Sequence, residues 1–295
     1  MNTPGEGLLR FLAVLMLTLC GVLLSLSSLA QETSWDYLLL EEHQSSKQQT
    51  GIEQAISAAD WQPGQGVAAF AYDGRPKWLR YKIPASDELR IFTISNAWLI
   101  AIDVYLMDGP RIVEQYTTGT EYPQSARPVA DTGFVFGITP DVTHVYIFDH
   151  GKSASYFPAE LRSTLEYSVF STRLNTFHGL YYGIVLIMIL YNLAIFIGTR
   201  DKAYLFYSLY ASSLIFFLST ADGTGSLFLW PEMPIIQSLA VAFGWGLAFI
   251  FLLEFAARFL AFQDSIRLTL WRRLGQASIG LIAIIVAVSP SPTLF

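Results

Sequence analysis

The sequence predicts an exported all-β domain, a jelly roll or β-sandwich, followed by an incomplete all-α bundle of membrane-spanning helices. Three observations predict this order. Charged residues make up only 14% of the 295 residues, well below the roughly 25% of soluble domains. Residues 31–176 hold 29 of the 42 charged side chains, whereas 177–295 is dominated by Leu, Ile, Phe and Ala. The polar part also contains short β-type runs separated by turn residues.

The N-terminus predicts a signal peptide. Arg10 precedes an apolar run that ends in Ser28–Ala30, with small residues where signal peptidase requires them. We expect residues 1–30 to be removed and the rest to be exported; an uncleaved anchor is the alternative. Cys20 is the only cysteine, so cleavage would leave a chain without disulfide or thiolate chemistry.

The predicted exported domain comprises residues 31–172. Its first part, 31–60, is polar and rich in Gln and Ser, and it predicts a helical or irregular lead-in. Beyond residue 65, about six β-type runs without intervening helical periodicity indicate a sandwich or jelly roll. These runs are 78–83, two within 89–107, 111–119, 133–138 and 144–150. The 18 acidic and 11 basic residues of 31–176 give a net charge of −7, which argues against a nucleic-acid partner.

The aromatic residues of the exported domain allow two interpretations. Trp78 and Trp98, with neighbouring Trp and Tyr residues, form either a stacking platform for sugars or core and cross-strand pairs. The neighbouring residues are Trp61, Tyr72, Tyr81 and Tyr105. We therefore treat Trp78 and Trp98 as candidate ligand-binding residues.

Arg127 and Asp131 are the polar candidates for ligand binding. They lie on a loop that enters a predicted strand, where they clamp either each other or a polar ligand. His144 and His150 lack the further ligands that zinc requires, and no catalytic or cofactor motif is present. We predict no metal, no cofactor and no enzymatic activity for these 295 residues.

Four apolar segments predict membrane spans in the domain 173–295. They are 177–198, 203–221, 235–255 and 275–290. The first has 22 residues without a formal charge, roughly 33 Å as a helix, which matches the hydrocarbon core of a bilayer.

Basic residues predict the orientation of these spans. Arg and Lys occur in the loops after the first and third spans, and neither occurs in the loop after the second. By the positive-inside rule, the first and third loops are cytoplasmic. The domain 31–172 is then periplasmic, and the chain is a multi-pass protein of a bacterial inner membrane.

Small and polar residues of the first span predict helix packing. Gly179 and Gly183 are four residues apart and predict a face on which another helix packs closely. Asn192 lies deep in the span, so we expect its amide to hydrogen-bond to a neighbouring helix, with Tyr191 or a hydroxyl of the second span as partner.

The motifs of both parts together resemble one family. HGLYYGIVLIMILYNLAIF and RDKAYLFYSLYASSLIFF are similar to the first two spans of bacterial seven-transmembrane receptors with diverse intracellular signalling modules. The matching positions are His178–Gly183, Tyr191-Asn192, Tyr204 and Tyr207. WLRYKIP, IDVYLMDG and ARPVADTGFVFGI resemble the family's extracellular sensory domain of the second type, a jelly roll related in shape to carbohydrate-binding modules. The resemblance covers residues 35–290.

The resemblance implies a signal-transduction receptor. Its periplasmic domain would bind a small ligand, such as a carbohydrate, and its helices would relay the signal to an output domain. The lipid bilayer and a second copy of the chain, as a homodimer, are the other expected partners. Packing and signalling residues would be His178, Gly179, Tyr182, Gly183, Tyr191, Asn192, Tyr204 and Tyr207.

The sequence departs from the family pattern in one respect. The family has seven spans and a cytoplasmic output domain, whereas this sequence shows four spans. We expect it to be a fragment of a longer gene product; a truncated protein that needs a partner is the alternative. The rival function is a transporter or channel component, for which Glu254 is the only candidate ionisable residue inside a span.

Overall fold

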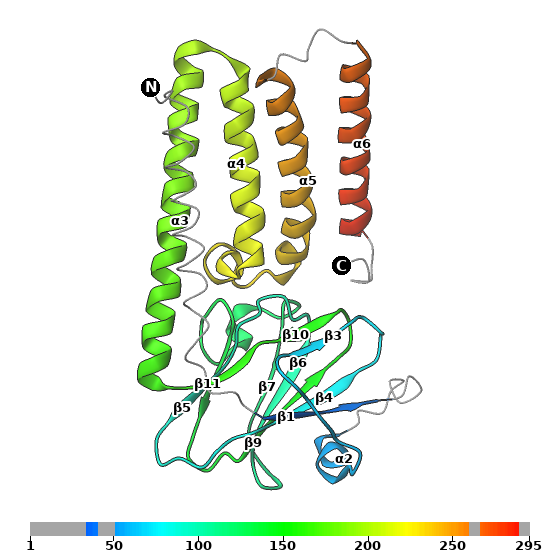
Figure 1. Ribbon diagram of the computed structural model, residues 1–295, viewed down its shortest axis with the longest axis vertical. Helices are drawn as coiled ribbons and strands as arrows, with labels where there is room; N and C mark the ends of the chain where they lie inside the picture. Colours follow the sequence, from blue (N-terminus) through cyan, green and yellow to red (C-terminus); the bar gives the residue numbers. More distant parts are fainter. Residues whose placement is uncertain (1–33, 41–50, 260–265, 289–295) are drawn as a thin grey trace, which may run out of the picture.

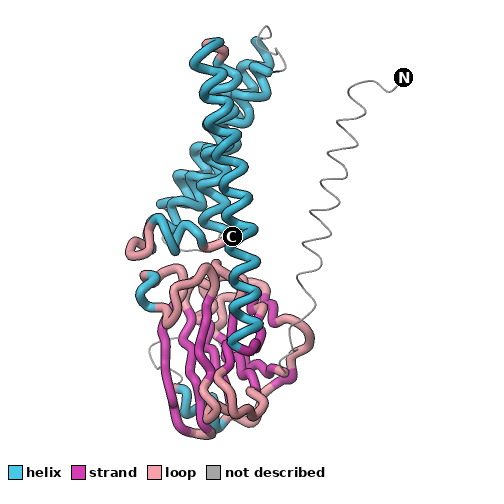
Figure 2. Tube along the Cα trace, turned by 90° about the vertical axis from the view of Figure 1, so that its left-hand side faces the viewer, coloured by secondary structure: helices cyan, strands magenta, loops and turns pink. Residues whose placement is uncertain are grey.

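The computed structural model describes residues 34–40, 51–259 and 266–288, with a β domain at one end and a bundle of long helices at the other (Figure 1). The first of these helices starts beside the β domain and continues into the bundle (Figure 1 and Figure 2). The predicted signal peptide, 1–30, lies outside the described residues.

Two antiparallel sheets form most of the β domain. The larger sheet has the order β2 (Gln62–Pro63), β1 (Trp35–Leu39), β4 (Lys77–Lys82), β9 (His144–Asp149), β6 (Ile102–Asp108) and β7 (Arg111–Thr118). The smaller sheet has the order β11 (Ala159–Ser163), β5 (Arg90–Ile94) and β8 (Phe134–Ile138). β10 (Ser155–Phe157) pairs with β3 (Ala68–Phe70), and two short helices are α2 (Ile52–Ser57) and η3 (Gln124–Ala126).

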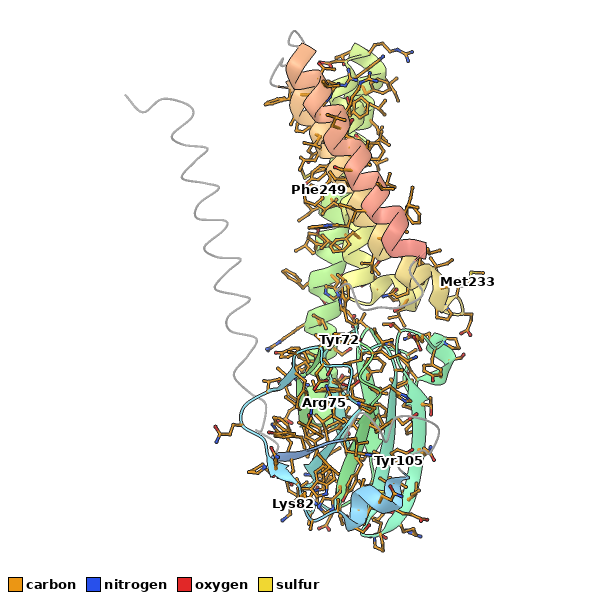
Figure 3. The ribbon with its side chains drawn as sticks, turned by 90° about the vertical axis from the view of Figure 1, so that its right-hand side faces the viewer. Tyr72, Arg75, Lys82, Tyr105, Met233 and Phe249 are labelled. Carbon is orange, nitrogen blue, oxygen red and sulfur yellow. The ribbon has the colours of Figure 1, made fainter. Side chains whose placement is uncertain are left out.

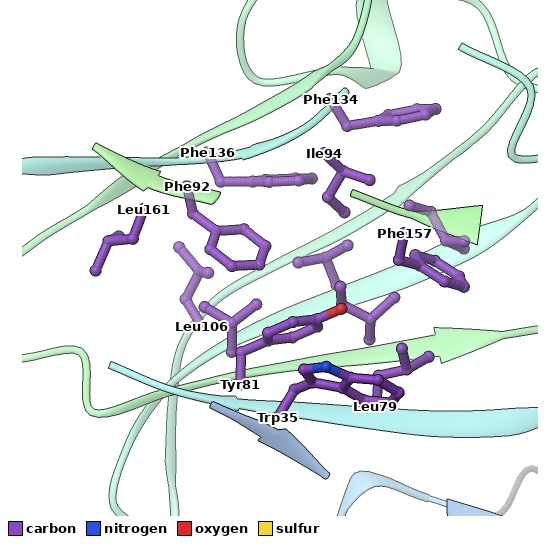
Figure 4. Close-up of a cluster of buried hydrophobic side chains, with 14 of the residues drawn as sticks. Trp35, Leu79, Tyr81, Phe92, Ile94, Leu106, Phe134, Phe136, Phe157 and Leu161 are labelled. Atoms are coloured by element: carbon purple, nitrogen blue, oxygen red, sulfur yellow. The ribbon is translucent and has the colours of Figure 1, made fainter. Parts of the chain in front are cut away.

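The main hydrophobic core lies between the two sheets (Figure 4). Side chains alternate across a strand, so Leu79 and Tyr81 of β4 point to the core, where they meet Phe92 of β5 and Phe136 of β8. Burial of the Tyr81 hydroxyl raises its pKa above the ordinary value. This arrangement is a β-sandwich, as the sequence predicts; the jelly-roll connection stays a prediction.

The opposite face of the larger sheet carries a second hydrophobic cluster. Trp78 of β4, Met107 of β6 and Tyr146 of β9 lie there, and Ala55 of α2 packs against them. Trp78 is only 1% exposed as a result. The larger sheet is therefore covered on both faces where α2 lies.

The structure confirms the predicted strands and adds others. Strands occur in each of the runs 78–83, 89–107, 111–119, 133–138 and 144–150, with two in 89–107. The predicted lead-in, 31–60, is partly wrong because Trp35–Leu39 is a strand that pairs with β4 along its whole length. Four further strands were not predicted: β2, β3, β10 and β11. They have two to five residues each, too few to show a clear period.

Four long helices follow the β domain. They are α3 (Thr164–Thr199), α4 (Lys202–Ala221), α5 (Pro234–Phe259) and α6 (Ile266–Val288), with a π-helical turn η4 (Gly225–Leu229) between α4 and α5. Over the described residues, α3, α4 and α5 have the length and hydropathy to cross a membrane. They contain the predicted spans 177–198, 203–221 and 235–255. The fourth predicted span begins within α6, and a fourth crossing stays a prediction.

α3 is too long to lie wholly within a bilayer. Its 36 residues correspond to about 54 Å, whereas a hydrocarbon core is about 30 Å thick. The surplus lies at the N-terminal end of α3, which contacts β11 and β5 of the smaller sheet. Figure 3 shows Met233 at the end of the bundle nearest the β domain, and Phe249 further along it.

Candidate functional site

The last strand of the β domain continues directly into α3. β11 ends at Ser163, and this residue caps the N-terminus of α3. The Glu166 amide donates to Ser163 Oγ at 3.2 Å, and the Ser163 amide donates to Glu166 Oε2 at 2.8 Å. This capping box satisfies the backbone donors that a helix start leaves free. The smaller sheet and the first long helix are therefore joined without a flexible segment.

A buried arginine fixes the loop before β8. Arg127 Nη1 donates to the carbonyl oxygens of Asp131 (3.0 Å), Thr132 (3.3 Å) and Gly133 (2.9 Å). Its guanidinium carbon lies 4.3 Å from the ring centroid of Phe134. Burial lowers the pKa of Arg127 to about 10, while the nearby Asp131 acts in the opposite direction, so the side chain is charged at neutral pH. The loop that carries Asp131 is held in one shape as a result.

The carboxylate of Asp131 connects this loop to α3. Its Oδ1 accepts hydrogen bonds from the Gly133 amide at 3.0 Å and Thr132 Oγ1 at 3.3 Å. Its Oδ2 accepts a hydrogen bond from the Tyr167 hydroxyl at 2.7 Å. Because Tyr167 is in the first turn of α3, the loop and the helix are tied together.

A second contact joins the β domain to the end of α4. Trp98 Nε1 donates to the carbonyl oxygen of Ala221, the last residue of α4, at 2.7 Å. Gly223 follows with φ = +81°, and a Cβ atom there would collide with the carbonyl oxygen of Thr132 and lie 3.0 Å from the Cβ of Ala97. Only glycine combines this backbone angle with so close an approach.

A third contact involves the segment after η4. The Gln124 amide donates to the Pro231 carbonyl at 2.7 Å, and Ser125 Oγ donates to Glu232 Oε2 at 2.9 Å. This segment is itself anchored to the bundle by Trp230, a buried residue whose Nε1 donates to Gln237 Oε1 of α5 at 2.8 Å. The β domain is thus docked on a well-packed connection between α4 and α5.

A polar cluster joins α3 to the segment between α4 and α5. The Tyr182 hydroxyl donates to Asp222 Oδ2 at 2.6 Å, and His178 Nε2 lies 4.0 Å from that oxygen. The Thr224 amide donates to Asp222 Oδ1 at 2.9 Å. Asp222, immediately after α4, therefore contacts side chains of α3 and the backbone at the start of η4.

A cavity of about 250 Å³ lies between these contacts. Its lining comes from β5, the loop that precedes β8, the N-terminal turns of α3 and the end of α4. Asp131, Tyr167, His178 and Asp222 are among the lining residues. We call it the junction cavity.

Two family models match the chain, and they divide it close to the start of α3. Residues 33–163 match the model described as 7TMR-DISM extracellular 2, and residues 174–295 match the model described as 7TM diverse intracellular signalling. The chain belongs to the bacterial seven-transmembrane receptors with diverse intracellular signalling modules. Both models are of receptor type, and the chain is a multi-pass membrane receptor with an extracellular domain. A search of curated proteins gave no match.

Trp78 and Trp98, the two candidate sugar-stacking residues of this receptor, lie in different places in the structure. Trp78 is buried under α2 and packs on Phe148, with ring centroids 4.9 Å apart, so the prediction that it contacts a ligand is wrong. Trp98 is 41% exposed, but it lies at the junction with α4 and not on the larger sheet.

Arg127 and Asp131 lie in one loop of the receptor, as the sequence indicates. The expected direct clamp is wrong in detail, because the Arg127 hydrogen bonds go to carbonyl oxygens and the Asp131 carboxylate turns to Tyr167. Arg127 thus has structural contacts within its loop, Asp131 is a contact between domains, and ligand binding by either residue stays a prediction.

Two predictions about the first span of the receptor are not met among the described residues, and the packing face stays a prediction for a helix or a second copy outside them. No atom lies within 4 Å of a Cβ built on Gly179 or Gly183, so no described helix packs closely on that face. Asn192 Nδ2 donates to the carbonyl oxygen of Met188 in its own helix at 2.8 Å, because a carbonyl four residues earlier is within reach of a short polar side chain.

The remaining predicted helix residues have different surroundings. Tyr191 is exposed on α3, and Tyr204 is half-buried on α4. Tyr207 of α4 packs on Phe255 of α5, with ring centroids 5.5 Å apart, so it contributes to helix packing. His178 and Tyr182 lie in the cluster around Asp222.

Sequence reasoning missed Tyr167 and the role of Asp222. Asp222 comes directly after an apolar span, and this position indicates that it lies at a helix end but not that it contacts α3. Nothing in the local sequence separates Tyr167 from the other tyrosines of α3, because its partner Asp131 is 36 residues earlier.

Proposed function

We propose that the β domain of this receptor binds a small polar ligand, such as a carbohydrate, in the periplasm, and that its helices relay the binding to a cytoplasmic output domain. One observation supports this proposal above the others. The β domain contacts α3, the end of α4 and the segment after η4 at separate points, and β11 enters α3 without a linker. A rearrangement of the sheets would therefore displace the helices.

The distribution of basic residues supports the periplasmic orientation. Arg200 and Lys202 lie at the end of the bundle away from the β domain (Figure 1). Arg258 and Arg272 lie together on α5 and α6, both near Glu254. The segment 222–234, which faces the β domain, contains no Lys or Arg. Short loops rich in basic residues remain in the cytoplasm, so the β domain would be on the other side of the membrane.

We call the contacts between the β domain, α3 and the segment 221–232 the junction. The relay requires two arrangements of the junction, and the β domain must bind the ligand more tightly in one arrangement than in the other. A ligand shifts such an equilibrium only by the difference between its two affinities. Couplings of about 1–3 kcal/mol are typical of allosteric proteins. Several single hydrogen bonds, each worth about 0.5–1.5 kcal/mol, connect the β domain to the helices, so breaking two or three of them suffices for such a coupling.

A ligand screen on the complete chain in nanodiscs tests the proposal. Binding of mono- and disaccharides is measured by calorimetry, and hydrogen exchange is then measured with and without each bound sugar. We expect a bound sugar to change exchange at 131–134 and 221–232, while the hairpin 108–111 at the far end of the larger sheet serves as the unaffected control. Binding with no change at the junction would contradict the relay. No binding by any sugar would contradict the ligand class.

The described contacts do not favour a transporter. Glu254 Oε2 accepts hydrogen bonds from Arg258 at 3.2 Å and Arg272 at 3.4 Å, and its Oε1 accepts one from Gln276 at 3.0 Å. A carboxylate engaged in this way has the contacts of a structural ion pair between α5 and α6.

A further inference from the structure

We infer that the junction cavity binds a small organic ammonium ion, a protonated amine attached to an apolar body. This goes beyond the proposed function, because the cavity lies where the β domain meets the helices and is lined by residues of both. Its effect on signalling rests on the proposed relay, whereas the binding itself does not.

The polar part of the lining favours a cation. Two carboxylates, Asp131 and Asp222, line the cavity, and its described lining contains neither Lys nor Arg. Their described hydrogen-bond donors are hydroxyl and amide groups, which carry no charge. Within the described residues neither carboxylate forms an ion pair with Lys or Arg, and His178 is the only basic group within 4.0 Å of Asp222.

Arg127 does not neutralise the cavity fully. It lies close enough to Asp131 for the carboxylate to favour its charged form. Its described hydrogen bonds nevertheless go to carbonyl oxygens, and the side chain is buried within the loop. Arg162 also lies beside the cavity, since its Nη1 donates to Thr93 Oγ1 and its guanidinium covers Phe170, but it forms an ion pair with Glu160. Asp131, Asp222 and Glu160 together with Arg127 and Arg162 leave one net negative charge, so an anionic ligand would meet net repulsion.

The rest of the lining favours an apolar body. One side of the wall is apolar and consists of Ile94, Phe134, Val135, Phe170 and Leu174. Phe134 and Phe170 each already have a guanidinium over one ring face, from Arg127 and Arg162, so they offer apolar contact to a ligand. A sugar hydroxyl that faces this apolar side would lose its hydrogen bonds to water without a replacement, at a free-energy cost.

The size of the cavity limits the ligand. A volume of about 250 Å³ corresponds to roughly eight water molecules at about 30 Å³ each. It is below the range of about 300–1,000 Å³ that is typical for drug-sized ligands. A short alkylammonium or arylalkylammonium ion fits these limits. Among the described residues, no three His, Cys, Asp or Glu side chains lie together as a metal site requires.

The two carboxylates of the proposed site also take part in the hydrogen bonds that hold the β domain, α3 and the end of α4 together. Asp131 belongs to the β domain and accepts from Tyr167, whereas Asp222 follows α4 and accepts from Tyr182. An ammonium ion on either carboxylate competes with a tyrosine of α3. Ligand binding would therefore alter the bonds that attach α3 to both neighbours.

Calorimetric titration of the complete chain in nanodiscs at pH 7 tests the inference. Three probes share one skeleton: phenethylammonium, neutral 2-phenylethanol and anionic phenylacetate. We expect saturable binding of phenethylammonium alone. The variants Asp131→Asn and Asp222→Asn are each expected to weaken it roughly tenfold to a hundredfold, which is the loss of one charge-assisted hydrogen bond. Asp87→Asn, an exposed carboxylate in the loop between β4 and β5, is the matched control and is expected to bind normally.

Three results would overturn the inference. The first is that phenethylammonium does not bind, and that two further ammonium ions, cyclohexylammonium and butylammonium, do not bind either. The second is that 2-phenylethanol binds as tightly as phenethylammonium. The third is that phenethylammonium binds both Asn variants as tightly as the unaltered chain. The comparison of probes uses the unaltered chain, so it decides the matter even where a variant misfolds. Binding without a change of hydrogen exchange at 131–134 and 221–232 would leave the site standing and contradict the relay. Failure of the ammonium probes would not affect the result of the sugar screen.

Discussion

Replacement of Gly223 by alanine is the sharpest perturbation of the junction. At φ = +81° an L-residue costs about 1–2 kcal/mol relative to glycine. The added Cβ would also collide with the Thr132 carbonyl, and relief of such overpacking costs about 1–3 kcal/mol. Together these effects predict that Gly223→Ala destabilises the docked junction by about 2–5 kcal/mol. The two domains themselves are expected to stay folded.

Hydrogen exchange followed by mass spectrometry on the chain in nanodiscs measures this effect locally. Segments 94–98, 131–134 and 221–226 are expected to exchange at least about tenfold faster in Gly223→Ala, because 1.4 kcal/mol corresponds to a factor of ten. Gly66→Ala is the matched control: Gly66 has φ = +63°, but no atom lies within 4 Å of its built Cβ. It carries the backbone cost without the collision, and it should leave those segments unchanged. Wild-type protection of the junction in Gly223→Ala would refute the close approach on which the account depends.

Three further predictions concern single contacts. Trp98→Phe removes the bond to the Ala221 carbonyl and is expected to weaken docking by about 1 kcal/mol, seen as faster exchange at 221–226 with an unchanged melting temperature of the β domain. Arg127→Met leaves three carbonyl oxygens without a donor and is expected to lower the free energy of unfolding of the β domain by about 3 kcal/mol, measured by chemical denaturation. Burial alone would raise the pKa of Asp103, but hydrogen bonds with His150 and Thr117 outweigh it and lower that pKa below the ordinary value. Asp103 therefore contributes stability above pH of about 4, and this contribution disappears as the pH falls further. Asp103→Asn is expected to destabilise the domain by about 1–3 kcal/mol at pH 6 and to make its stability less dependent on pH between 5 and 3, as an acid titration of tryptophan fluorescence would show; an unchanged acid profile would contradict this.

Local patterns were sufficient for the central elements of the fold. The alternation in β4 predicts that Leu79 and Tyr81 share one face, and both are in the main core. The uncharged stretch 177–198 predicts a helix and lies within α3. These features depend on period and composition, which a sequence displays directly.

Features that depend on distant partners could not be predicted in this way. WDYLL, the sequence of β1, shows no clear alternation, and its strand conformation comes from pairing with β4 about 40 residues later. The burial of Trp78 depends on α2, which covers the outer face of the sheet. The contact of Tyr167 with Asp131 exists only because α3 returns along the smaller sheet.

The β domain is docked on the connection between α4 and α5, and we propose that both lie outside the cytoplasm. Cross-linking in intact bacterial cells tests it most directly, with Ser125→Cys and Glu232→Cys in a background where Cys20 is replaced by Ser. Ser125 Oγ and Glu232 Oε2 are 2.9 Å apart, so a short bis-methanethiosulfonate is expected to join the two positions within one chain. The same reagent should not join Ser125→Cys to Thr199→Cys, which lies at the far end of α3. Rapid cross-linking of the first pair alone is the predicted result, and its failure while both cysteines react singly would contradict the docked junction.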